Sequence, residues 1–177
     1  MKKKVIKIIV TAVIILLAFV IQSTLSLHLN TTVPAPNLLL LVTCLFGFIR
    51  GQNFGSVTGL CCGLLMDVMF GDVIGLYALI FAYIGFFSGL FKNLLHMDHI
   101  YVPMFLVFGN DFLLNAAIYV FRFLLRNKLD FSFYFRQIIF PEMLITAFIA
   151  LLVYKLFYKL NDKIYIEKQE SELNFGK

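Results

Sequence analysis

Apolar runs alternate with short polar segments along the whole chain, and this pattern predicts a bundle of membrane-spanning helices. A helix needs about 20 predominantly apolar residues to cross the hydrocarbon core of a bilayer. Six runs approach or reach this length, at about residues 5–27, 37–49, 54–70, 73–91, 100–121 and 138–157. We therefore expect an all-α integral membrane protein, with one domain over residues 1–177 built from about six transmembrane helices.

Two of these runs differ from an ordinary span. The run at 37–49 is too short, so it would have to reach across by snorkelling of Arg50, by local thinning of the bilayer, or as one arm of a helical hairpin. The run at 5–27 follows a basic start and could pass for a signal peptide. Its apolar stretch exceeds the usual ~7–15 residues of such a peptide, so we expect it to remain as the first span.

Composition supports a membrane protein, and the placement of charge predicts its orientation. The chain is 61% hydrophobic and 14% charged, with a mean hydropathy of +0.91, whereas a soluble domain of this length carries more polar surface. With six spans, eleven of the 15 Lys and Arg residues fall on the side of the two termini. Since positively charged segments stay inside, we expect a multi-pass protein of the cytoplasmic membrane with both termini in the cytoplasm.

Glycines recur at every fourth position around the third run. The series consists of Gly51, Gly55, Gly59 and Gly63, and it continues through Asp67 to Gly71 and Gly75. Because a four-residue step turns a helix by only ~40° beyond one full turn, these positions form one slowly spiralling face without side chains. Such a face lets helix backbones approach closely in lipid. It either packs against another helix of the same chain or receives a helix of a partner protein.

Asp67 is the one position of this series with a charged side chain. A lone carboxylate facing lipid would cost about 2.5–3.5 kcal/mol, so we expect Asp67 to face protein along the glycine face. There it could lock helices together by accepting N–H hydrogen bonds from a neighbouring backbone or helix N-terminus, or be protonated and donate one. A proton or ion role is the alternative, although no second strong feature in this segment supports it.

A second group of polar residues lies in the middle of the run at 100–121. It consists of Asn110, Asp111 and Asn115, and the last two share one helix face at a four-residue spacing. Together with Asp67 they could form one buried polar cluster. Ionisable residues inside a membrane indicate a transport or coupling site by default. Interhelical hydrogen bonding explains them equally well, since no basic residue lies at that depth to complement two carboxylates.

Motifs for other chemistry are missing from the sequence. Cys44, Cys61 and Cys62 lie in apolar runs without metal-ligand spacing, and the segment from His96 to His99 offers too few ligands for a metal. No nucleophile motif, zinc-protease motif or phosphate-binding loop occurs. The basic residues lie beside apolar spans and form no soluble patch, which disfavours nucleic acid. We expect no enzyme activity, no metal and no cofactor.

Several motifs occur together between about residues 34 and 90. A Pro-containing turn leads into a Leu-rich helix ("PAPNLLLL"), and Arg50-Gly51 and the glycine series with Asp67 follow. Then come Phe70-Gly71, the run "GLYAL" from Gly75 to Leu79, and finally Gly85 and Gly89. In this combination the chain resembles the core of the MreD family of rod shape-determining membrane proteins. Asn37 departs from the family, in which an acidic residue is frequent there, so no charge-dependent role carries over to it.

The resemblance implies both a fold and a function. The fold would be similar to that of the substrate-binding subunits of energy-coupling-factor vitamin transporters. The function would be that of a non-catalytic component of the rod complex, or elongasome, in contact with membrane lipid. It would bind MreC, and through it MreB and the RodA–penicillin-binding-protein synthase, and help control cell shape during lateral peptidoglycan synthesis. The alternative, favoured by the intramembrane polar residues, is a small-molecule-binding membrane subunit of a transporter.

Overall fold

Six α-helices make up the part of the chain that the computed structural model describes, which is residues 2–29, 35–71, 73–94, 101–126 and 135–154. The first five are α1 (Lys2–Leu29), α2 (Leu38–Arg50), α3 (Gln52–Phe70), α4 (Leu76–Leu94) and α5 (Tyr101–Arg126). A short π-helix, η1 (Phe135–Ile139), continues into the sixth helix, Phe140–Tyr154. Within the described ranges the chain contains no strand. The segment from His96 to His99 lies outside them.

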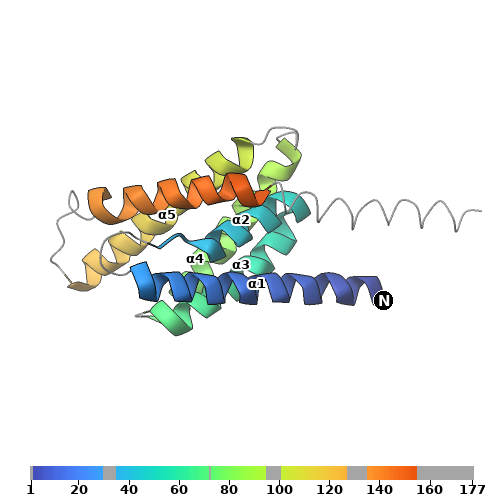
Figure 1. The fold of residues 1–177 in the computed structure, drawn as a ribbon, viewed down its shortest axis with the longest axis horizontal. Helices are drawn as coiled ribbons and strands as arrows, with labels where there is room; N and C mark the ends of the chain where they lie inside the picture. The colour runs from blue at the N-terminus through green and yellow to red at the C-terminus, as the bar shows by residue number, and fades with distance from the viewer. Residues whose placement is uncertain (1, 30–34, 72, 95–100, 127–134, 155–177) are drawn as a thin grey trace, which may run out of the picture.

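Three of the six helices are long and apolar enough to cross a membrane. These candidate spans are Ile8–Leu27 within α1, Gln52–Phe70, and Val102–Phe121 within α5, and three shorter apolar helices accompany them. The helices form one elongated bundle, in which the start of α1 and the end of the sixth helix lie at the same end (Figure 1). The prediction of an all-helical protein with several membrane-spanning helices is therefore confirmed as far as helix length and composition show it.

The short helix α2 forms the centre of the bundle. Every residue from Leu39 to Ile49 is buried, and the helix packs against α1, α3, α4 and α5. This burial explains how a helix of 13 residues fits into a membrane protein. Neighbouring helices surround it in place of lipid, so its length need not match the thickness of the bilayer.

The first turn of α2 is held by side chains from three parts of the chain. Asn37 caps the helix by accepting a 3.1 Å hydrogen bond from the backbone N–H of Leu40. Oε1 of Gln22 on α1 accepts a 2.9 Å bond from the N–H of Leu39. The N–H of Asn37 itself donates to Oγ1 of Thr146 on the sixth helix at 3.1 Å. Because a buried N–H without a partner costs about 1–3 kcal/mol, these bonds tie the first and last helices to the core.

Candidate functional site: a glycine seam, a buried polar cluster and a basic groove

The glycines of α3 lie against the backbone of α4, which runs antiparallel to α3. A Cβ atom at Gly59 would overlap the carbonyl oxygen of Phe81, and one at Gly63 would lie 2.5 Å from the Cα of Ala78. Gly55 is equally close to α4. Only a hydrogen atom fits at these positions, so the two helices touch backbone to backbone. We call Gly55, Gly59 and Gly63, with the α4 backbone that faces them, the glycine seam.

A third helix joins this seam at one level. A Cβ atom on Gly47 of α2 would lie 2.7 Å from the carbonyl oxygen of Gly85 on α4, and one on Gly55 would lie 2.6 Å from the Cα of Gly47. Three helices therefore meet at Gly47, Gly55 and Gly85. Gly47 precedes Gly51 by four residues, so it extends the glycine register one step earlier. The predicted series begins only at Gly51, although Gly47 has the same spacing.

The other three glycines of the series lie at helix ends. Gly51 links α2 to α3 and Gly75 precedes α4, and both have positive φ angles, of 101° and 98°. Residues with a Cβ atom rarely adopt this conformation. Gly71 follows α3, and its N–H donates to the carbonyl oxygen of Asp67 at 3.1 Å. The series thus combines a packing face with turn positions.

Asp67 caps the N-terminus of α4 from the neighbouring helix. Its Oδ2 accepts hydrogen bonds from the N–H groups of Gly75 and Ala78, both at 3.0 Å, and its Oδ1 accepts one from Tyr77 at 2.9 Å. The side chain is only 2% exposed. Gly75 has no side chain with which to cap the helix that follows it, so Asp67 supplies the capping oxygens. The positive end of the α4 dipole and three N–H donors suit a carboxylate.

Asn110, Asp111 and Asn115 are all buried, but they contact different neighbours. Nδ2 of Asn110 donates to Oγ of Ser88 on α4 at 3.1 Å. Nδ2 of Asn115 instead donates to Oδ1 of Asp111 at 3.3 Å, within α5. Among the described residues, Asp67 bonds none of these three, because its carboxylate faces the start of α4.

Residues of the sixth helix lie beside Asp111 and Asn115. The carboxyl group of Glu142 lies near that of Asp111 and beside the Asn115 amide. Thr146 also lies beside Asp111. Oδ2 of Asp111 is buried and has no hydrogen-bond partner in the described part of the chain. We call Asp111, Asn115, Glu142 and Thr146 the polar cluster. Glu142 and Thr146 are not part of the predicted cluster, since local spacing does not reveal that α5 lies beside the sixth helix.

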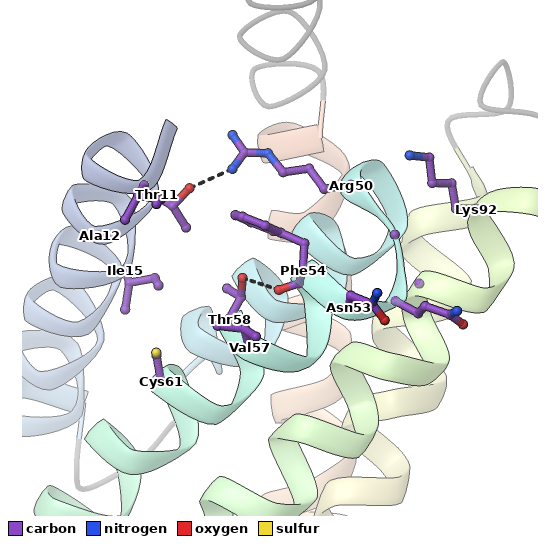
Figure 2. A pocket seen from close by; sticks show the side chains of 14 residues that line it. Thr11, Ala12, Ile15, Arg50, Asn53, Phe54, Val57, Thr58, Cys61 and Lys92 are labelled. Atoms are coloured by element: carbon purple, nitrogen blue, oxygen red, sulfur yellow. Dashed lines mark hydrogen bonds between the residues drawn. The ribbon is translucent and has the colours of Figure 1, made fainter. Parts of the chain in front are cut away.

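An open groove of about 790 Å³ lies between α1 and the start of α3 (Figure 2). Its lining is mostly apolar, and Arg50 and Lys92 lie at one end of it. The Arg50 guanidinium donates to Oγ1 of Thr11 at 2.8 Å. It also stacks on the rings of Phe46 and Phe54, with its Cζ 4.8 and 4.5 Å from the ring centroids. The sequence pattern does not predict this basic groove, because residues of α1, of α4 and from both sides of the α2–α3 link form it together.

The three parts of the candidate site differ in what they can do. The glycine seam packs helices together, the polar cluster brings buried polar groups into contact, and the basic groove can receive a ligand. The seam is closed by backbone contacts, and several buried polar side chains, such as Asn110 and Thr146, bond residues of other parts of the bundle. Among the residues that the structure describes, no group of three or more His, Cys, Asp or Glu side chains could hold a metal ion. The geometry favours packing and binding.

Comparison with known proteins tests the resemblance found in the sequence. A family model described as rod shape-determining protein MreD matches residues 2–164. The match includes all six helices and therefore extends well beyond the motifs of residues 34–90. Searches of curated proteins and of solved structures find no match to the chain. The matched residues cover most of the sequence, and the chain accordingly belongs to the MreD family of rod shape-determining proteins.

Proposed function

We propose that this chain is a non-catalytic membrane scaffold of the rod complex that binds MreC, and through MreC joins MreB and the RodA–penicillin-binding-protein synthase. Membership of the MreD family supports a role in determining rod shape, which would be exerted during lateral peptidoglycan synthesis. The bonding of the buried polar residues agrees with a scaffold. Asp67 caps a helix and Asn110 bridges two helices.

The observation that carries this proposal is the glycine seam. Backbone contact between α2, α3 and α4 makes a rigid unit, because the helices cannot slide past one another without collision. The Asp67 cap fixes one end of the α3–α4 hairpin. Around this unit, apolar side chains such as Leu17 on α1 and Val68 on α3 are exposed. A rigid unit with apolar outer faces suits a protein that holds membrane partners in fixed positions.

The proposed location is the cytoplasmic membrane, with both termini in the cytoplasm. The start of α1 and the end of the sixth helix share one end of the bundle (Figure 1). Arg50 and Lys92 lie at the basic groove, which Ile8 and Thr11 near the start of α1 also line. Positive charge therefore gathers at this end, as expected for the cytoplasmic side. The six-helix bundle is compatible with the proposed kinship to energy-coupling-factor substrate-binding subunits.

A matched pair of glycine substitutions tests the scaffold. Gly59→Leu places a side chain against the carbonyl group of Phe81, whereas Gly109→Leu on α5 meets open space. We expect Gly59→Leu to separate α3 from α4, to abolish co-purification with MreC and to cause loss of rod shape. Gly109→Leu should retain all three properties. Pull-down of MreC, size-exclusion chromatography and cell microscopy measure the outcome, and normal binding by Gly59→Leu would contradict the role of the seam.

Cross-linking separates binding from folding, because it leaves the seam intact. Single cysteines replace exposed residues at Leu17, Val57, Val68 and Phe148, in a background without the exposed Cys61. In intact cells we expect one of these faces to cross-link to MreC and the others to remain free. If none of the faces cross-links and MreC does not co-purify with the wild-type chain, the scaffold proposal is wrong.

The polar cluster favours a second candidate function, a small-molecule-binding subunit of a transporter. The buried Oδ2 of Asp111 lacks a partner among the described residues, and a buried polar atom without a partner is costly unless a ligand or water bonds it. Mass spectrometry of the purified protein would then detect a small polar molecule that Asp111→Asn no longer retains. Such a molecule, together with failure to bind MreC, would favour the transporter subunit over the scaffold.

A further inference from the structure

The basic groove has the size and the lining of a ligand site. Its volume of about 790 Å³ falls within the range of roughly 300–1,000 Å³ that is usual for small-molecule sites. Ala12 and Ile15 of α1 face Val57 and Phe54 of α3 across it (Figure 2). The groove is therefore an apolar channel between two helices, and its open side meets the surroundings of the bundle.

One end of this channel carries two cations, and among the described residues that line it there is no carboxylate. Arg50 is half-buried and uses one of its five N–H donors for Thr11. Neither Arg50 nor Lys92 forms an ion pair with any residue that the structure describes. A guanidinium that is partly withdrawn from water and held between two rings is well placed to bind an anion from outside the chain.

We propose that the groove binds one anionic phospholipid, with its phosphate at Arg50 and Lys92 and an acyl chain between α1 and α3. Arginine recognises phosphate oxygens through its planar fork and lysine as a point charge. From Phe54 to Cys61 the apolar wall follows the axis of α3 for ~10 Å at 1.5 Å per residue. A free anion would leave this wall uncovered, whereas a phospholipid occupies both the cationic end and the wall.

The bilayer favours this occupant over a partner helix. Ile8 lines the channel and Leu16 follows on the same helix, and both are exposed apolar residues, so in a bilayer lipid would surround α1 at high local concentration. A partner helix would cover the wall but would have to carry an acidic group at the depth of Arg50. The lipid site goes beyond the scaffold function and does not depend on MreC.

The chain contains no Trp, so a single introduced Trp can report on the lipid beside it. Val57→Trp places the reporter in the groove, and Phe148→Trp places a control on the outer face of the sixth helix. The native residues are 65% and 63% exposed. The full-length protein is reconstituted in phosphatidylcholine vesicles that contain brominated phosphatidylglycerol or brominated phosphatidylcholine, and Trp quenching is measured. We expect phosphatidylglycerol to be enriched over phosphatidylcholine beside the groove reporter, by about fivefold for each of the two cations. The control reporter should show no preference for either lipid.

Substitutions of the cations test the assignment further. Lys92→Gln leaves the stacking of Arg50 on Phe46 and Phe54 intact, and we expect it to reduce the preference about fivefold. Adding Arg50→Gln should remove the preference, while Arg136→Gln, at an exposed position on η1, should leave it unchanged.

Four outcomes would overturn the proposal. The first is equal quenching of the groove reporter by the two lipids, and the second is an unchanged preference in Lys92→Gln. The third is quenching by neither lipid, which would show that protein fills the groove. The fourth is loss of the preference on addition of inorganic phosphate at millimolar concentration, which would identify a site for free anions.

Discussion

Asp67 shows how a single costly residue is accommodated inside a membrane protein. Its carboxylate accepts three backbone N–H bonds at the start of α4, where the preceding Gly75 offers no capping side chain. The positive φ of Gly75 turns the chain into α4, and Asp67 supplies the oxygens that the glycine lacks. The two residues therefore act as one divided helix cap, which accounts for the position of the carboxylate without a proton or ion role.

We expect Asp67→Asn to lower the free energy of unfolding by about 1–3 kcal/mol. The amide keeps one acceptor oxygen, but its NH₂ group would face backbone N–H groups of Gly75 and Ala78 that now lack an acceptor. Reversible denaturation in mixed micelles measures the change. If Asp67→Asn unfolds like the wild type yet fails to maintain rod shape in cells, capping does not explain the residue.

Gly75 and Gly109 form a natural comparison of backbone conformation. A Cβ atom at either position would have no described residue within 4 Å, but Gly75 has a φ of 98°. We expect Gly75→Ala to destabilise the fold by about 1–2 kcal/mol, since a left-handed conformation strains a residue with a Cβ atom. Gly109→Ala lies within a helix and should stabilise it by roughly 0.5–1 kcal/mol. Thermal unfolding in detergent measures both changes, and equal shifts would contradict the argument.

At the level of single helices, the sequence predicts the features that a lipid environment and helix geometry impose on each segment by itself. The run at 54–70 corresponds to α3 (Gln52–Phe70), because a spanning helix has to be apolar over most of its length. The glycine register likewise reveals a face without side chains, because it depends only on the helical period.

Local sequence patterns do not reveal which helices pack against each other. Glu142 and Asp111 come together because the sixth helix lies beside α5, and Arg50 reaches Thr11 because α1 runs alongside α2. These pairings depend on the arrangement of the whole bundle. The sequence therefore predicts only part of the polar cluster and does not predict the basic groove. The same reason applies to α2, because its short length is explained by its burial among other helices, which the sequence alone does not show.

The arrangement of the whole molecule predicts its orientation in the membrane. Lys92 lies near the end of α4 that borders the basic groove, while α5, with 26 residues, carries the chain ~39 Å along the bundle at 1.5 Å per residue. The π-helix η1, which carries Arg136, lies at this far end of the bundle (Figure 1). Since positive charge gathers at the end with the groove and the start of α1, this end should face the cytoplasm, and the proposed lipid site would open into the cytoplasmic leaflet.

Cysteine labelling tests this orientation in intact cells. Arg136→Cys and Lys92→Cys are made in a Cys61→Ala background, in which the remaining described cysteines, Cys44 and Cys62, are buried. We expect a membrane-impermeant maleimide to label Arg136→Cys directly and Lys92→Cys only after the membrane has been permeabilised. The reverse pattern would place both termini outside, where the rule for positive charge does not put them. It would also move the basic groove to the outer leaflet, so the orientation and the leaflet of the lipid site are settled by the same measurement.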